Sequence, residues 1–242
     1  MQISKYILFE NDDYLVLHKP AGLLSIPDRH NPALANLAAL LEQRYGEIFV
    51  VHRLDRNTSG VMVFARHAAA HKFLSAQFQE RTTEKMYLAL VQGRVWESEG
   101  TIDSPIAESS GRRGKMIISP KGKPALTTFE VLEPFNLYTL LKIRLHTGRT
   151  HQIRVHMQSI GHPIAGDELY GDGKPFYLSF IKKQYRLSRD QQEERPLMSR
   201  TALHALSLGF SDEKGQRHFY EAPLPKDFRA VLSQLQKHAR IA

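Results

Sequence analysis

The segment 52–60 most constrains the fold, because it places a run of mainly polar and charged residues between two short apolar stretches. Residues 49–51 before it and 61–65 after it are rich in β-branched and aromatic side chains, which favours strands. We therefore expect a polar loop anchored at both ends by buried strands. Side chains on a loop held in this way are well placed for binding or catalysis.

Short apolar runs and helical repeats alternate along the rest of the chain, which is typical of an α+β fold. We expect a mixed, largely antiparallel sheet with flanking helices. The expected strands cover residues 6–9, 14–17, 49–51, 61–65, 85–91, 129–132, 138–145, 203–210 and 217–220. The expected helices cover residues 31–46, 68–79, 150–161 and 226–238.

Two of these helices have expected N-caps, Asn31 before Pro32 and Thr150, since short polar side chains there accept hydrogen bonds from the first turn. In the helix at 150–161, Ile153, Met157 and Ile160 recur at helical spacing. We expect these three side chains to form its buried stripe.

The net charge of +8 and the pI near 9.6 point to a nucleic-acid partner, although a basic protein need not bind one. The clustering of basic residues in one segment strengthens the case for a nucleic-acid partner. Residues 108–124 are punctuated by glycine and proline, which predicts a flexible loop or hairpin. Its basic residues are Arg112, Arg113, Lys115, Lys121 and Lys123.

The length of 242 residues suits one large domain or two small ones, and we expect a single domain over 1–242. The charged stretch 181–200 is expected to be an exposed insertion. The longest apolar run, residues 86–91, is far shorter than the roughly 20 residues of a membrane-spanning helix. The chain has no cysteine, which excludes disulfides and thiolate metal sites and suits the reducing cytoplasm where we expect it.

Asp55 is the candidate catalytic carboxylate of the polar loop. Arg53 and Arg56 flank it, and nearby cations favour the ionised form that a nucleophile or base needs. The alternative is an ordinary surface ion pair, which contributes little to stability.

The segment after residue 145 carries a second cluster. His151, Arg154 and Gln158 are spaced by three and four, so they share one polar face of the expected helix. This face could bind a phosphate, hold a carboxylate or simply be solvated.

Two further features stay open. Tyr87 lies in the strand 85–91 and could stack on a base or belong to the core. Asp167 and Asp172 could join Asp55 in a divalent-metal site, as in a nuclease, but their spacing does not demand it. Phosphate-binding glycine loops, dinucleotide fingerprints and His-Glu-x-x-His motifs are absent from the sequence.

Taken together, these segments resemble the RluA branch of the RNA pseudouridine synthases. The most specific match is 52–60, which fits the catalytic signature of that family over its whole length. The other matching segments are Lys19-Pro20-Ala21-Gly22, Lys85-Met86-Tyr87, 147–156, 161–164, Gly166-Asp167, Leu203-His204-Ala205 and 222–225.

The resemblance implies that the enzyme isomerises uridine in RNA without a cofactor or metal. It implies a central RNA-binding cleft in which Asp55 is the essential carboxylate and Arg154 pairs with it. Tyr87 would pack on the target base and help to remove the proton from carbon 5. Arg53 would fill the gap that the extruded base leaves.

The resemblance also implies an RNA path lined by basic residues. These are Arg53, Arg56, Arg149, His151, Arg112, Arg113, Lys115, Lys121 and Lys123. Longer members carry an N-terminal S4-type RNA-binding domain, and we expect this chain to lack it, since the first expected strand begins at residue 6. We expect a monomer that acts on tRNA, large-subunit rRNA or both. The alternative is a non-enzymatic RNA-binding protein on the same fold.

Overall fold

The computed structural model describes residues 2–182, 185–186 and 193–241. It divides into two compact units, neither of which is a continuous stretch of chain. The first unit comprises Met1–Tyr87 and His204–Pro223, and the second comprises Leu88–Leu203 and Leu224–Ala242. Within the described ranges, no helix is both long enough and apolar enough to cross a membrane.

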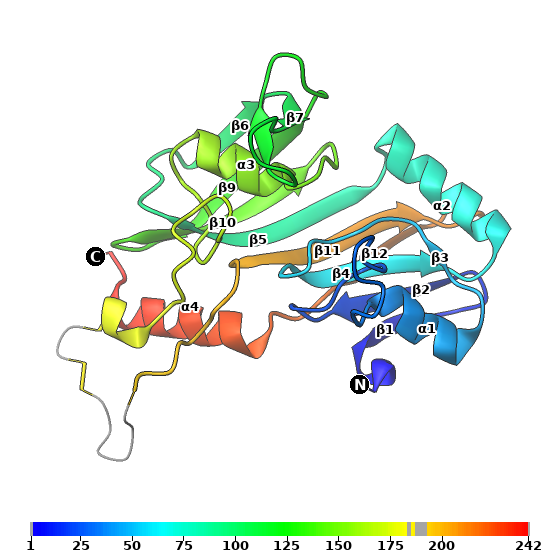
Figure 1. Ribbon diagram of the computed structural model, residues 1–242, viewed down its shortest axis with the longest axis horizontal. Helices are drawn as coiled ribbons and strands as arrows, with labels where there is room; N and C mark the ends of the chain where they lie inside the picture. Colours follow the sequence, from blue (N-terminus) through cyan, green and yellow to red (C-terminus); the bar gives the residue numbers. More distant parts are fainter. Residues whose placement is uncertain (1, 183–184, 187–192, 242) are drawn as a thin grey trace. The chain divides into compact units, whose positions relative to one another are not determined.

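The first unit is built on a mixed sheet in which the neighbouring strands follow the order β1-β2-β4-β11 (Figure 1). Strand β3 pairs with β4, and β12 pairs with β11. The pairing of β4 with β11 is parallel, and the other pairs are antiparallel. The strands are β1 (Ile7–Glu10), β2 (Tyr14–Lys19), β3 (Phe49–Val50), β4 (Ser59–Ala65), β11 (Leu203–Ser211) and β12 (Arg217–Glu221).

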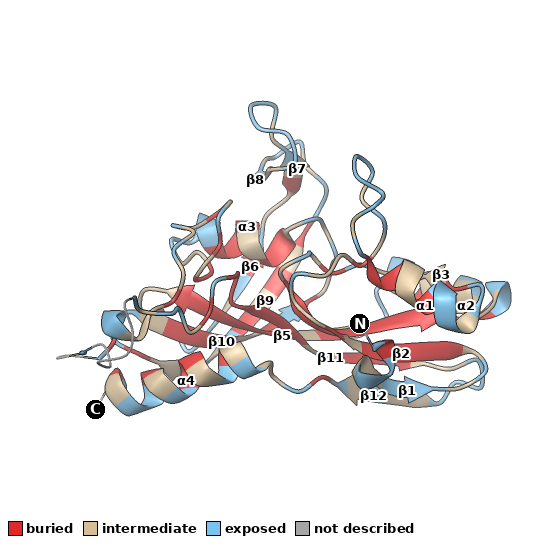
Figure 2. Ribbon diagram, turned by 60° about the horizontal axis from the view of Figure 1, so that its bottom comes forward, coloured by how far each residue is buried: buried red, intermediate tan, exposed pale blue. Residues whose placement is uncertain are grey.

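Strand β4 is the centre of this unit, because every one of its residues is buried. The helices α1 (Leu37–Tyr45) and α2 (Ala68–Glu80) lie on the same side of its sheet (Figure 2). The short 3-10 helix η1 covers Ile3–Tyr6 and contacts β2.

The predicted start of the first helix is wrong. The α-helix begins at Leu37, and Asn36 caps it by accepting a hydrogen bond from the Ala39 N–H at 2.9 Å. Residues 31–35 form turns instead, in which Leu34 N–H donates to the Asn31 carbonyl. Both asparagines suit a cap, and only the one followed directly by Leu37 leads into the buried face.

The second unit has a sheet with the neighbouring strands in the order β5-β10-β9-β6 and a separate hairpin, β7-β8. The hairpin confirms the prediction of a hairpin in this region. Its turn carries Arg112, Arg113 and Lys115, whereas Lys121 and Lys123 follow β8. The strands are β5 (Glu84–Gln92), β6 (Glu99–Asp103), β7 (Ile106–Glu108), β8 (Met116–Ile118), β9 (Leu126–Pro134) and β10 (Tyr138–Leu145). The first residues of β5, up to Tyr87, belong to the first unit.

Two α-helices pack on opposite sides of this second sheet, α3 (Gln152–Ser159) and α4 (Lys226–His238) (Figures 1 and 2). Helix α4 buries Phe228, Val231, Leu232 and Leu235 along one stripe, as its spacing predicts. A short 3-10 helix, η2, covers Leu178–Phe180.

Helix α3 begins later than predicted, and Thr150 is not its cap. The cap residue is His151, whose φ of 55° lies in the left-handed region. No side-chain hydrogen bond caps the start of this helix. The Gln152 Oε1 instead accepts from the Arg149 N–H at 3.0 Å, in the turn that precedes the helix. Ile153 and Met157 are buried as predicted, but Ile160 is 39% exposed because the helix ends before it.

The α+β class and the largely antiparallel sheet with flanking helices are thus confirmed. Of the stretch 181–200, residues 183–184 and 187–192 lie outside the described residues. Within the rest, the expected exposure is wrong for Ile181, Met198 and Arg200, which are buried. The central cleft stays a prediction.

Candidate functional site

The loop that carries Asp55 is fastened to the first unit by a serine from a neighbouring loop. Ser25 Oγ donates to the Leu54 carbonyl at 2.8 Å and accepts from the Leu54 N–H at 3.1 Å. The Asp55 carbonyl accepts from Thr58 N–H at 3.1 Å, which closes the turn before β4. Leu54 is buried and Asp55 is half-buried, so the backbone next to the carboxylate is held firmly.

Lys19 supports the same loop from β2. Its side chain is fully buried, and Nζ donates to the carbonyls of Pro20, Leu23 and Arg56 at 2.7–3.0 Å. A buried ammonium is costly unless all its donors are paired. The three carbonyls provide that pairing and tie the segment after Lys19 to the residue next to Asp55.

His52 anchors the start of the loop as a neutral ring. Its Nε2 accepts from the Val63 N–H at 3.1 Å, and the ring stacks on Phe78 at 4.6 Å between centroids. Burial, reinforced by the positive charge of Lys85, lowers the pKa of His52 to about 3. An accepting nitrogen needs a free lone pair, so the hydrogen bond and the pKa agree on the uncharged form.

The end of the loop is fixed by close contact between β4 and β11. Gly60 has a φ of 125°, and a Cβ there would lie 2.1 Å from the Ala205 carbonyl oxygen. Beside it, Ser59 Oγ lies 2.9 Å from His204 Nδ1, and His204 Nε2 lies 3.0 Å from the Ala222 carbonyl. Since a carbonyl only accepts, Nε2 carries the proton and Nδ1 accepts from the serine hydroxyl.

Tyr87 and Asp55 belong to the same unit. The Tyr87 side chain is buried, and burial together with the negative charge of Asp55 raises the pKa of its hydroxyl. The negative charge of the Asp55 carboxylate therefore acts on the buried hydroxyl of Tyr87. At neutral pH the phenol keeps its proton.

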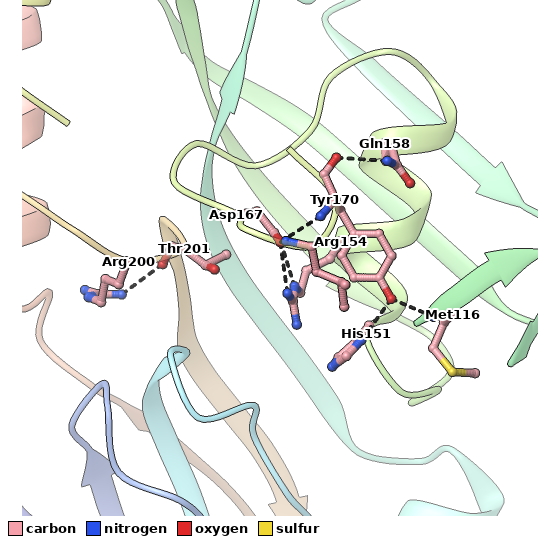
Figure 3. Close-up of polar contacts among 9 residues, drawn as sticks. Met116, His151, Arg154, Gln158, Asp167, Tyr170, Arg200 and Thr201 are labelled. Atoms are coloured by element: carbon pink, nitrogen blue, oxygen red, sulfur yellow. Dashed lines mark hydrogen bonds and ion pairs between the residues drawn. The ribbon is translucent and has the colours of Figure 1, made fainter. Parts of the chain in front are cut away.

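The second unit holds Arg154 in a two-point contact with Asp167. The Nε–Oδ2 and Nη2–Oδ1 distances are 2.6 and 2.9 Å, and the carboxylate is fully buried (Figure 3). Burial alone would raise the pKa of Asp167, but Arg154 and the N–H groups of Leu169 and Tyr170 outweigh it and lower the pKa. The predicted pairing of Arg154 with Asp55 joins residues of different units and stays a prediction.

Tyr170 is the residue on which the predicted polar face converges (Figure 3). His151 Nδ1 lies 2.9 Å from its hydroxyl, the Arg154 guanidinium lies 4.9 Å from its ring centroid, and Gln158 Nε2 donates to its carbonyl at 2.9 Å. Of the alternatives left open by the sequence, the face holds a carboxylate, through Arg154.

A second arginine–aspartate pair lies in the same unit. Arg200 binds Asp227 of α4 through Nε and Nη2 at 2.6 and 3.0 Å. Its Nη1 donates to the Thr201 carbonyl at 3.1 Å (Figure 3). The Arg200 backbone also packs closely on Gly166, next to Asp167.

The predicted RNA-binding residues lie mainly at the surface. Arg53 and Arg56 are exposed on the Asp55 loop, where Arg56 Nε donates to the Gly22 carbonyl at 3.0 Å. Arg149 Nε donates to the Pro124 carbonyl at 3.1 Å, beside the hairpin. Arg112, Arg113, Lys121 and Lys123 are exposed, and Lys115 and His151 are half-buried.

Among the described residues, no group of three histidine, aspartate or glutamate side chains is arranged to hold a metal ion. Asp167 instead serves Arg154, and Asp172 Oδ1 accepts from the Lys174 N–H at 3.1 Å. Sequence reasoning missed Asp167 as the arginine's partner, and it missed the roles of Tyr170 and His52. The spacing of Asp167 and Tyr170 was the available signal, because an aspartate often accepts from backbone N–H groups two and three residues on.

Comparison with known proteins supplies the deciding observation. Residues 13–159 match the RNA pseudouridylate synthase family, and this match covers both Asp55 and Arg154. The chain belongs to that family. Named relatives place it within the RluA branch of the pseudouridine synthases, which are isomerases.

The chain is 42% identical over 239 residues to a ribosomal large subunit pseudouridine synthase D from Nitrosomonas europaea. The match covers 95% of this chain and 65% of that protein, so the chain spans just under two thirds of that relative's length. It is 43% identical over 179 residues to a dual-specificity RNA pseudouridine synthase RluA from Vibrio vulnificus, covering 72% of each.

A solved structure supports the pseudouridine synthase fold. Human RNA pseudouridylate synthase domain containing 4 aligns with a TM-score of 0.73 and 25% sequence identity. The alignment covers 97% of this chain and 94% of that one.

Proposed function

We propose that this chain converts specific uridines of tRNA, large-subunit rRNA or both into pseudouridine, with Asp55 as the essential carboxylate. The proposal rests chiefly on Asp55, whose loop Ser25, Lys19 and His52 hold in place and whose charge acts on the buried Tyr87 of β5. The proposed substrate class is taken from two relatives. One is named as a ribosomal large subunit pseudouridine synthase, and the other is named as a dual-specificity RNA pseudouridine synthase.

The reaction breaks the bond between ribose C1′ and uracil N1 and forms a bond from C1′ to C5. C5 then loses its hydrogen as a proton and N1 gains one, so the atoms balance without a redox partner. No metal or cofactor is needed in this scheme. An ionised Asp55 assists the first step, and Tyr87 packs on the detached base and helps to remove the C5 proton.

Arg154 is the proposed partner of Asp55, keeping its carboxylate ionised where water is scarce. Charge-assisted hydrogen bonds from a guanidinium are strong and directional, so the orientation of the arginine matters. Asp167 sets that orientation, because it occupies Nε and Nη2 of Arg154.

We further propose that Arg53 fills the gap left by the extruded base and that RNA follows a path along the exposed arginines and lysines. That path comprises Arg53, Arg56, Arg149, His151, Arg112, Arg113, Lys115, Lys121 and Lys123. Residues 1–242 act as one catalytic domain with a central RNA-binding cleft, as a cytoplasmic monomer. Light scattering of the protein with and without RNA tests the monomer.

The deciding experiment is tritium release from RNA that carries uridine labelled at C5, with unmodified tRNA and unmodified large-subunit rRNA assayed separately. We expect release by the wild type and none by Asp55→Ala or Asp55→Asn, with RNA binding retained. Asp12→Asn is the matched control and should release tritium at the wild-type rate. Full release by Asp55→Asn would contradict the role of Asp55, and binding without release by the wild type would favour a non-enzymatic RNA-binding protein.

A further inference from the structure

Tyr170 uses its ring, its hydroxyl and both backbone polar groups in contacts with functional elements of the second unit. Only 2% of its surface is exposed. Its contacts reach the β7-β8 hairpin on one side and the Arg154–Asp167 pair on the other (Figure 3). Neither the proposed chemistry nor the proposed RNA path assigns it a role.

The hydroxyl connects Tyr170 to the hairpin. Met116, the first residue of β8, donates its N–H to the tyrosine Oη at 2.8 Å. The Lys115 ammonium lies 5.7 Å from the ring centroid. Since the backbone just after the basic turn is bonded to this hydroxyl, the position of the turn depends on it.

The ring and the main chain connect Tyr170 to Arg154. The guanidinium carbon lies 4.9 Å from the ring centroid, within the range of a cation–π contact. The Tyr170 N–H donates at 3.0 Å to Asp167 Oδ1, the same oxygen that accepts from Arg154 Nη2. The arginine is therefore held between the aromatic face and a carboxylate that Tyr170 helps to orient.

His151 provides a third connection at the start of α3. Its left-handed backbone, with φ of 55°, is uncommon for a residue other than glycine and persists only where its surroundings hold it. The Tyr170 Oη lies 2.9 Å from His151 Nδ1. An Oη that accepts from Met116 still has its own proton to donate to that nitrogen. The hydroxyl thus bonds the hairpin and the helix that presents Arg154 at the same time.

We propose that Tyr170 is a positioning residue that couples the basic hairpin to Arg154, so that RNA held by the hairpin sets the place of the arginine. This inference rests on the proposed function, because the hairpin must contact RNA and Arg154 must act in the reaction. The hydroxyl transmits the position of the hairpin, and the ring supports the arginine.

Two substitutions separate these contributions. Tyr170→Phe keeps the ring and removes the hydroxyl, so we expect the Kd for RNA to rise about fivefold while kcat at saturating RNA stays within about twofold. Tyr170→Leu removes the ring as well, and we expect kcat to fall at least about tenfold further. Tyr45→Phe, which removes a hydroxyl bond to Glu10 at 2.6 Å in the other unit, should leave both quantities unchanged.

The decisive measurement is a double-mutant cycle for RNA binding between Tyr170→Phe and Arg112→Ala, with unmodified RNA as the probe. We expect Arg112→Ala to weaken binding several-fold less in the Tyr170→Phe background than in the wild type, because the turn is already displaced there. Additive effects would overturn the proposal. Equal kcat values for the Phe and Leu variants, per correctly folded protein, would overturn it as well.

The cycle needs no turnover, so it separates this proposal from the proposed function. If the wild type releases no tritium, the proposed function fails and with it the part of this inference that concerns Arg154. A non-additive cycle would then still establish the coupling of Tyr170 to the hairpin.

Discussion

Both oxygens of the Asp167 carboxylate are bonded to one side chain, that of Arg154, through Nε at 2.6 Å and Nη2 at 2.9 Å. The carboxylate is fully buried and the arginine is 13% exposed. The buried Asp167 carboxylate therefore fixes the position of the Arg154 guanidinium. The first prediction follows from this contact.

Asp167→Asn should cost stability and activity together. Removing one charge from a buried pair typically destabilises by about 3–5 kcal/mol, since the other charge is left uncompensated. Urea unfolding measures this loss, and tritium release measures kcat. The control is Asp227→Asn, which breaks the Arg200 pair where the carboxylate is 33% exposed. It should cost less stability and should spare kcat per folded molecule; equal effects of the two variants would contradict the assignment.

Stability should fall as the pH drops from about 6.5 to about 3, partly because of His52. Its pKa in the folded protein is about 3, against about 6.5 in the unfolded chain. Below pH 6.5 the unfolded state therefore takes up a proton that the folded state does not, and stability is lost. One such group contributes a slope of at most about 1.4 kcal/mol per pH unit.

To test the role of His52, the free energy of unfolding is measured from about pH 8 to about pH 4 in steps of ~0.5 pH unit, for the wild type and for His52→Gln. The amide oxygen of glutamine can still accept from Val63, but it does not titrate. We expect a flatter profile for this variant. A wild-type slope in His52→Gln would show that other groups cause the pH dependence.

Gly60→Ala should be strongly destabilising, whereas Gly215→Ala should cost little. Both glycines have positive φ, 125° and 80°, so both substitutions introduce backbone strain. Only at Gly60 would the new Cβ also meet a neighbouring strand, 2.1 Å from the Ala205 carbonyl. We expect a loss of about 3 kcal/mol or more for Gly60→Ala and about 1 kcal/mol for Gly215→Ala. Similar urea midpoints for the two variants would mean that β11 yields easily.

RNA affinity should fall steeply with salt, because phosphate contacts release counterions. Arg112→Ala should reduce the slope of log K against log salt by about one. Glu108→Gln, at the other end of the same turn, is the matched control and should leave the slope unchanged or slightly steeper. Filter binding from dilute to physiological salt measures both, and a flat wild-type dependence would contradict a phosphate path.

Local patterns were enough to locate much of this architecture and the loop at its centre. The apolar residues on either side of 52–60 predict the strands that anchor Asp55, and the spacing of His151, Arg154 and Gln158 predicts the face that α3 presents. These features depend on neighbours in the sequence, and such neighbours impose strand and helix periodicity directly.

Contacts between distant segments could not be predicted in the same way. Asn31 and Asn36 both suit the cap of α1, and only packing decides for Asn36. The sequence around Asp167 allows a metal ligand, whereas in the folded chain this carboxylate holds Arg154. Which partner a carboxylate finds depends on the turn after α3, whose geometry no periodic pattern specifies.

The contact between Ser59 and His204 spans 145 positions of the chain. It closes the first unit only after the polypeptide has passed through nearly all of the second, and α4 then returns to the second unit. During synthesis, neither unit can be completed from residues that have already left the ribosome until the final part of the chain emerges. The fold of the first unit is therefore completed late, and fragments cut at residue 87 or 203 would each lack strands that their own sheet requires.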